Sequence, residues 1–158
     1  MKKELIHDPI FLAVKSDAAT PDDLPTARDL IDTLTEHSDD CVGMAANMIG
    51  VRRRIIVFYD ESEKTPTYTV MMNPVITEKH GEYTAKEGCL SLLGAPRECR
   101  RFRTIKVRYQ TPEFHMRTKK IHGIYGADHS ARDRPLRRSA DMTLPARSCA
   151  ARKTSAPA

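Results

Sequence analysis

The sequence predicts an α+β domain, with one amphipathic helix near the N-terminus followed by antiparallel strands. Two observations support this prediction. Apolar residues recur at helical spacing in a single N-terminal segment. Six later segments are short, rich in β-branched or aromatic residues, and separated by turn-forming residues. With 158 residues, the chain has the length of one domain that can bury a hydrophobic core.

The helix is expected over residues 21–37. Thr20 can cap its N-terminus, Pro21 suits the first helical position, and Asp23 completes a capping box. Because a helix turns once in about 3.6 residues, one face would carry the apolar residues Leu24, Ala27, Leu30, Ile31 and Leu34.

The strands are expected at residues 54–59, 67–72, 73–78, 81–85, 104–109 and 114–119. In the fifth of these segments, Ile105, Val107 and Tyr109 alternate with Lys106 and Arg108. Such alternation is typical of a strand with one buried face and one face in water. Turn residues predict the breaks between strands, at residues 60–65, Asn73-Pro74, Gly81, Gly94 and Thr111-Pro112.

The composition changes near Gly123. Residues 1–123 carry 19 Lys or Arg against 18 Asp or Glu, whereas residues 124–158 carry 7 against 3. The second segment also lacks an apolar period, so it cannot bury enough surface to offset the entropy lost on ordering. We therefore expect a domain at residues 1–123 and a basic, disordered tail at residues 124–158.

Location and redox chemistry follow from what the sequence contains. It shows no secretory signal pattern and no run of the roughly 18 apolar residues that a membrane span needs, so a cytoplasmic protein is expected. The four cysteines, Cys41, Cys89, Cys99 and Cys149, show no CxxC spacing. A conspicuous cysteine in such a chain is expected to be a ligand, a nucleophile or a core residue.

Two segments carry candidate chemistry. Residues 41–50, Cys-Val-Gly-Met-Ala-Ala-Asn-Met-Ile-Gly, are small enough for close backbone approach, either to a substrate or in a tight connection. Residues 87–91 read Glu-Gly-Cys-Leu-Ser. The Cys89 thiolate can bind a metal and the N–H of Leu90 can face an oxyanion; the alternative is a buried, inert cysteine.

Together the two segments resemble the peptide deformylase family, whose motifs are Gly-φ-Gly-φ-Ala-Ala-x-Gln, with φ apolar, and Glu-Gly-Cys-Leu-Ser. The resemblance covers about residues 4–123. It implies an α+β hydrolase that removes the formyl group from N-formylmethionyl nascent peptides. These peptides are the expected partner, with the ribosome as a second one and with no membrane or nucleic acid.

The resemblance also implies roles for particular residues. Cys89 would bind a divalent metal, commonly iron, with zinc or nickel as alternatives, together with two His of a C-terminal His-Glu-x-x-His helix. Leu90 would donate its backbone N–H to the oxyanion, and Met48 stands where the family has a second donor, Gln. Val42 and Gly43 would bind the substrate backbone as an added strand.

The sequence departs from the family at two places. Met48 has a thioether, which cannot donate a hydrogen bond. More seriously, no His-Glu-x-x-His occurs anywhere in the chain, and His122 and His129, near the expected place, lack the intervening Glu. The chain as written is therefore expected to lack the C-terminal metal-binding helix, to retain no metal, and to be inactive.

A single-base frame displacement near Gly123, in the gene or in its sequencing, would explain the loss. Codons can be chosen for residues 124–142 that encode the sequence as written in one reading frame. When the same bases are read one position later, they encode Phe-Thr-Ala-Gln-Ile-Ile-Gln-His-Glu-Ile-Asp-His-Cys-Glu-Gly-Val-Leu-Ile and then a stop. The two His codons would overlie Ala131-Arg132 and Pro135-Leu136. Two other hypotheses remain open: a non-catalytic module that binds formyl-peptides, and a nucleic-acid binder that uses the Arg-rich tail.

Overall fold

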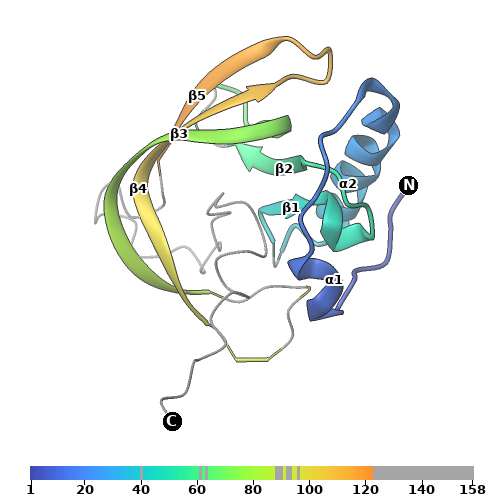
Figure 1. Ribbon diagram of the computed structural model, residues 1–158, viewed down its shortest axis with the longest axis horizontal. Helices are drawn as coiled ribbons and strands as arrows, with labels where there is room; N and C mark the ends of the chain where they lie inside the picture. Colours follow the sequence, from blue (N-terminus) through green and yellow to red (C-terminus); the bar gives the residue numbers. More distant parts are fainter. Residues whose placement is uncertain are drawn as a thin grey trace.

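The computed structural model describes residues 1–39, 41–60, 62, 64–87, 91, 94–95 and 97–122 (Figure 1). These residues form two α-helices, two 3-10 helices and five strands: α1 (Pro9–Ala13), η1 (Pro21–Asp23), α2 (Leu24–Glu36), β1 (Gly43–Ala45), η2 (Ala46–Ile49), β2 (Ile55–Asp60), β3 (Thr67–Glu87), β4 (Arg97–Gln110) and β5 (Met116–His122). The strands make one antiparallel sheet in the order β1-β2-β3-β4-β5.

The predicted α+β fold is confirmed. The proposed tail at residues 124–158, and with it the expected loss of a C-terminal helix, lies outside the described residues.

The predicted N-terminal helix is confirmed, with its first turn in the tighter 3-10 form. The Asp23 carboxylate accepts hydrogen bonds from the Thr20 backbone N–H at 2.8 Å and from the Thr20 hydroxyl at 3.2 Å. The first bond satisfies a backbone donor at the start of the helix, and the second joins the two side chains of the capping box. Leu30 and Leu34 are fully buried, as the apolar period predicts.

The sheet separates two hydrophobic clusters, because side chains alternate between its faces. Ile55 and Val57 of β2 belong to the cluster that packs with α2, whereas Ile56 and Phe58 belong to a second cluster on the other face. Figure 1 shows α2 against the end of the sheet that holds β1 and β2. The second cluster is completed by the buried residues Ala45, Met71, Ile105, Val107 and Tyr109.

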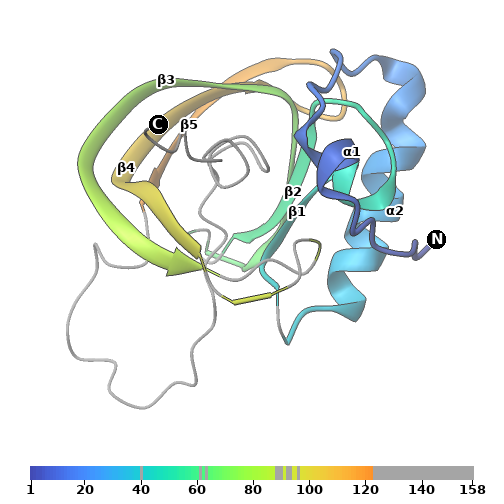
Figure 2. The ribbon, with the colours of Figure 1, turned by 60° about the horizontal axis from the view of Figure 1, so that its bottom comes forward.

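Three predicted strands, at 67–72, 73–78 and 81–85, are in fact one long strand, β3. The residues predicted to form turns instead form bends within it: Asn73 has φ 51° and Gly81 has φ 70°. The pairing with β4 shifts register between Met72 and Val75 and again between Ile76 and Glu78, as it does at a β-bulge. Bulges and turns both use residues that tolerate positive φ, which is why the sequence did not distinguish them. Figure 2 shows the resulting curvature of β3 and β4.

The Asn73 bend is held by its own side chain. The amide oxygen accepts a hydrogen bond from the Ala19 N–H at 2.7 Å, and the amide nitrogen donates to the Ala19 carbonyl at 2.9 Å and to Gln110 Oε1 at 2.8 Å. The segment before α2 is thereby tied to β3 and β4.

Short elements were missed by the sequence prediction. α1, β1 and η2 span five, three and four residues, too few for a period to show. In the part of the chain that the structure describes, no helix has the length and apolar character to cross a membrane.

Candidate active site

The first motif forms an edge of the sheet. β1 pairs with β2 in the register Gly43↔Phe58, Met44↔Val57 and Ala45↔Ile56, and it is the terminal strand of the sheet order. The motif was expected to be a loop, and this short strand with the 3-10 turn η2 corrects that expectation.

The backbone groups of Gly43 point away from β2. The N–H of Tyr59 donates to the carbonyl of Val42 at 2.8 Å, so a hydrogen bond joins Val42 and Tyr59, the pair next to Gly43–Phe58. In an antiparallel ladder this bond identifies Gly43–Phe58 as a pair that does not exchange hydrogen bonds, so the Gly43 N–H and C=O face the outer edge of β1. No further strand pairs with this edge among the described residues, and we call it the open edge. The Cys41 thiol lies 2.9 Å from the Gly43 carbonyl as a weak donor. The edge therefore presents one donor and one acceptor at the residue predicted to bind substrate.

Met48, at the family's Gln position, lies on η2 and is buried in the cluster that packs with α2. Its backbone carbonyl accepts a hydrogen bond from the Ile6 N–H at 2.8 Å. The neighbouring Asn47 is also buried and donates from Nδ2 to the Leu12 carbonyl at 3.2 Å, while its Oδ1 has no partner among the described residues. Both motif residues are thus held against the N-terminal segment.

The second motif is described only at its ends. Cys89 and Leu90, the predicted metal ligand and oxyanion donor, lie outside the described residues. Ser91, the last residue of the motif, is fully buried. Its carbonyl oxygen lies 3.1 Å from Nδ1 of His7.

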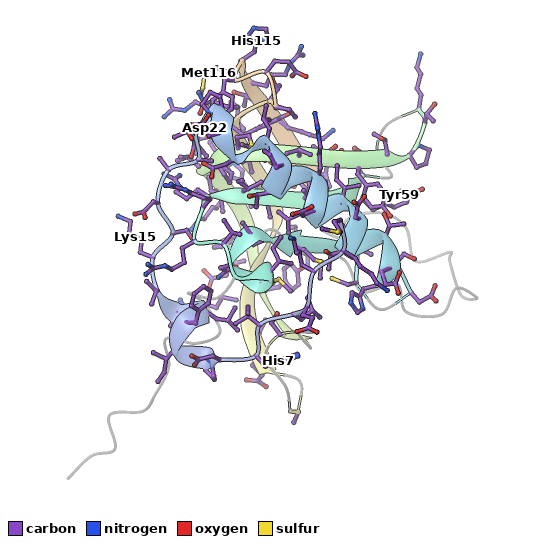
Figure 3. The ribbon with its side chains drawn as sticks, turned by 90° about the vertical axis from the view of Figure 1, so that its right-hand side faces the viewer. His7, Lys15, Asp22, Tyr59, His115 and Met116 are labelled. Carbon is purple, nitrogen blue, oxygen red and sulfur yellow. The ribbon has the colours of Figure 1, made fainter. Side chains whose placement is uncertain are left out.

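The N-terminal segment is the functional feature that the sequence did not reveal. Consecutive residues bond to the two motifs, Ile6 to Met48 and His7 to Ser91. Figure 3 shows His7 near α1, at the opposite end of the molecule from His115 and Met116. A contact over 84 residues of sequence leaves no local pattern, although a His ahead of the Asp-Pro start of α1 could have drawn attention.

The best-defined electrostatic feature is a carboxylate at the end of β2. Lys119 Nζ lies 2.6 Å from Asp60 Oδ2, and Ser62 donates to Oδ1 from its N–H at 3.0 Å and its hydroxyl at 2.6 Å. Burial alone would raise the pKa of Asp60, but the hydrogen bonds from Lys119 and Ser62 outweigh it, and the pKa lies below its ordinary value. The group is therefore an anion held in place, without the raised pKa of a general acid.

The residues that the structure describes do not form a site for a catalytic metal. Among those that the structure describes, no three His, Cys, Asp or Glu side chains gather closely enough to hold an ion. His122, one of the two histidines near the expected place, ends β5 and lies with Nδ1 3.2 Å from the Thr104 hydroxyl. The other, His129, is outside the described residues. The full sequence supplies the motif cysteine but no His-Glu-x-x-His.

Comparison with known proteins identifies peptide deformylases as relatives. A family model described as polypeptide deformylase matches residues 5–127. The peptide deformylase of Clostridium beijerinckii is 42% identical over 124 residues, which cover 78% of this chain and 88% of that protein.

Solved structures agree on the fold. Peptide deformylase from Thermus thermophilus superposes with a TM-score of 0.68 at 29% identity, over 80% of this chain and 74% of that one. A class I type b peptide deformylase from Acinetobacter baumannii, solved with Met-Ala-Ser bound, gives a TM-score of 0.67 at 21% identity, over 78% and 86% of the two chains.

Proposed function

The chain belongs to the peptide deformylase family, and on this premise we propose that it has the fold of a hydrolase for N-formylmethionyl peptides but, as translated, lacks the residues for hydrolysis. The family predicted from the two motifs is confirmed, and its members are metal-dependent hydrolases. What we propose for this polypeptide is narrower: peptide recognition by the first motif, and loss of the catalytic segment by a displaced reading frame.

The loss of the His-Glu-x-x-His segment carries this proposal. The family match ends at residue 127, just beyond the change of composition at Gly123. The neighbouring frame of residues 124–142 can encode the missing segment, as described above. A frame displacement accounts for the abrupt end of the likeness and for the basic composition that follows it.

Without the His-Glu-x-x-His segment, the chain loses two histidine metal ligands and the glutamate general base together. In the family, the divalent metal supplies a water molecule of lowered pKa. A single cysteine thiolate leaves two of the three protein ligands that such a site needs unfilled. General acid–base catalysis alone contributes a factor of about 10² to 10⁴ in other enzymes. We therefore expect this chain to hydrolyse formyl-peptides no faster than the free metal ion in solution does.

The open edge of β1 supports the proposed substrate class. An extended peptide can add to such an edge through main-chain hydrogen bonds, and Gly43 offers an N–H and a C=O for this purpose. The Acinetobacter baumannii relative was solved with the tripeptide Met-Ala-Ser bound. We propose that Gly43 pairs with the backbone of an N-formylmethionyl peptide, whereas the backbone of Val42 faces β2, where its carbonyl accepts the hydrogen bond from Tyr59.

Two proteins, compared side by side, test this function. One is the full chain as written, and the other is translated from the same gene after deletion of the first base of codon 124. Each is loaded in turn with Fe²⁺, Zn²⁺ and Ni²⁺, and metal content and hydrolysis of formyl-Met-Ala-Ser are measured. We expect one tightly bound metal per chain and turnover only after the deletion.

Resequencing the DNA around codon 123 serves as the control. If its neighbouring frame does not encode His-Glu-x-x-His, the frame proposal is wrong. Stoichiometric metal together with turnover in the chain as written would contradict the proposed inactivity.

A further inference from the structure

Two adjacent residues near the N-terminus contact the two motifs at once, Ile6 through its backbone and His7 through its side chain. The Ile6 N–H donates to the Met48 carbonyl at 2.8 Å, and His7 Nδ1 lies 3.1 Å from the Ser91 carbonyl. Consecutive Cα atoms are about 3.8 Å apart across a trans peptide. The two bonds therefore join the end of the first motif to the end of the second through the peptide unit between Ile6 and His7 and the side chain of His7.

The chemistry of the His7 contact defines its direction. A carbonyl oxygen only accepts hydrogen bonds, so Nδ1 of His7 must carry the proton. In the neutral ring this leaves Nε2 without a proton. The bond is thus specific to one tautomer of the imidazole, which gives it a spectroscopic signature.

Because Ser91 is buried, the loss of its hydrogen bond with His7 carries a free-energy cost. Ser91 is fully buried, and its hydroxyl has no partner among the described residues. A buried carbonyl without a donor costs the full desolvation of that group. Loss of the imidazole donor is therefore expected to release Ser91 from its place rather than to leave it there unsatisfied.

From these contacts we propose that His7 is a positioning residue for Ser91, the last residue of the Glu87–Ser91 motif. It acts through the Ser91 carbonyl, two residues after Cys89, and it holds that end of the motif at a set distance from Met48. This positioning does not depend on the proposed function, and the following experiment measures it without metal or turnover.

Hydrogen–deuterium exchange of the full-length chain tests the proposal on three proteins: the unmodified chain, His7→Phe and His7→Asn. Phe keeps a ring but has no donor, whereas Asn places its Nδ2 donor close to where Nδ1 lies. We expect His7→Phe to speed exchange in the segment containing residues 87–91 by about five- to tenfold. We expect His7→Asn to restore the exchange to within about twofold of the unmodified chain.

The helix α2 provides the internal control, because it contacts neither His7 nor Ser91 through a hydrogen bond in the described residues. Unchanged exchange at residues 87–91 in His7→Phe would overturn the proposal. Equal acceleration in α2 would also overturn it, because the effect would then be global destabilisation. Nitrogen-15 NMR of the unmodified chain must show the proton on Nδ1; an Nε2–H tautomer contradicts the proposed bond.

Discussion

Lys119 and Asp60 form an ion pair of 2.6 Å, although β3 and β4 lie between the strands that carry them. The ion pair shows that β2 and β5 approach each other, and Figure 2 shows the curvature of β3 and β4, which lie between them in the sheet. Both side chains are shielded from water, with 17% of Lys119 and 5% of Asp60 exposed. The pair therefore fastens the curved sheet at a point where no backbone pairing joins β2 to β5.

Replacing Lys119 by Met should destabilise the domain by about 1.5–3 kcal/mol, because a buried carboxylate loses its charged donor. Lys120→Met is the matched control. Lys120 is the next residue of β5, it points to the opposite face, and it is exposed. Urea unfolding of both variants measures the difference. Equal stabilities of the two variants would show that the ion pair contributes nothing.

The lowered pKa of Asp60 predicts a pH dependence of this contribution. A carboxyl group whose pKa is lower in the folded state stabilises the fold above its unfolded pKa, which is 3.8 here. That stabilisation is lost as the pH falls through the lower pKa of the folded state. The free energies of unfolding of the unmodified chain and of Asp60→Asn should therefore differ most at about pH 5–7, and the difference should shrink as the pH falls through the lowered pKa of the folded state. A difference that widens on acidification would contradict the assignment.

Two substitutions at the Asn73 bend distinguish the effect of backbone conformation on stability from the effect of the side-chain hydrogen bonds. Asn73→Gly keeps the ability to adopt φ 51° but loses the bonds to Ala19 and Gln110, whereas Asn73→Ala loses both. We expect Asn73→Ala to be less stable than Asn73→Gly by about 1 kcal/mol, the typical cost of the left-handed conformation. Thermal and urea unfolding measure this difference. If Ala were as stable as Gly, positive φ at this bend would not be a constraint.

The sequence predicted the parts of the fold that depend on local periodicity. The helix that includes Leu30 and the strand that includes Val107 were recognised because their apolar residues repeat within a few positions. β3 was divided wrongly, since Asn73, which lies where the register shifts, serves equally well in a bulge and in a turn. The ion pair at Asp60 and the contact of His7 with Ser91 could not be predicted, because each joins residues far apart in the sequence.

The candidate site likewise has parts that the sequence could predict and parts that it could not. Its family could be predicted from two short motifs, because each motif is contiguous in sequence. The direction in which the backbone of Gly43 faces depends on its pairing with Phe58, which only the sheet register defines. The support that the N-terminal segment gives to both motifs likewise appears only in three dimensions.

The open edge at Gly43 predicts an alternating response to backbone methylation of the ligand. In an antiparallel pair, only every second residue directs its N–H and C=O toward a given neighbour. Two variants of formyl-Met-Ala-Ser, N-methylated at Ala or at Ser, would be titrated against the full chain by calorimetry. We expect one of them to bind about five- to tenfold more weakly than the unmethylated peptide, because it has lost the hydrogen bond with Gly43, and the other to bind nearly unchanged. Equal weakening by both methyl groups, or by neither, would show that the peptide does not lie along β1 as an added strand.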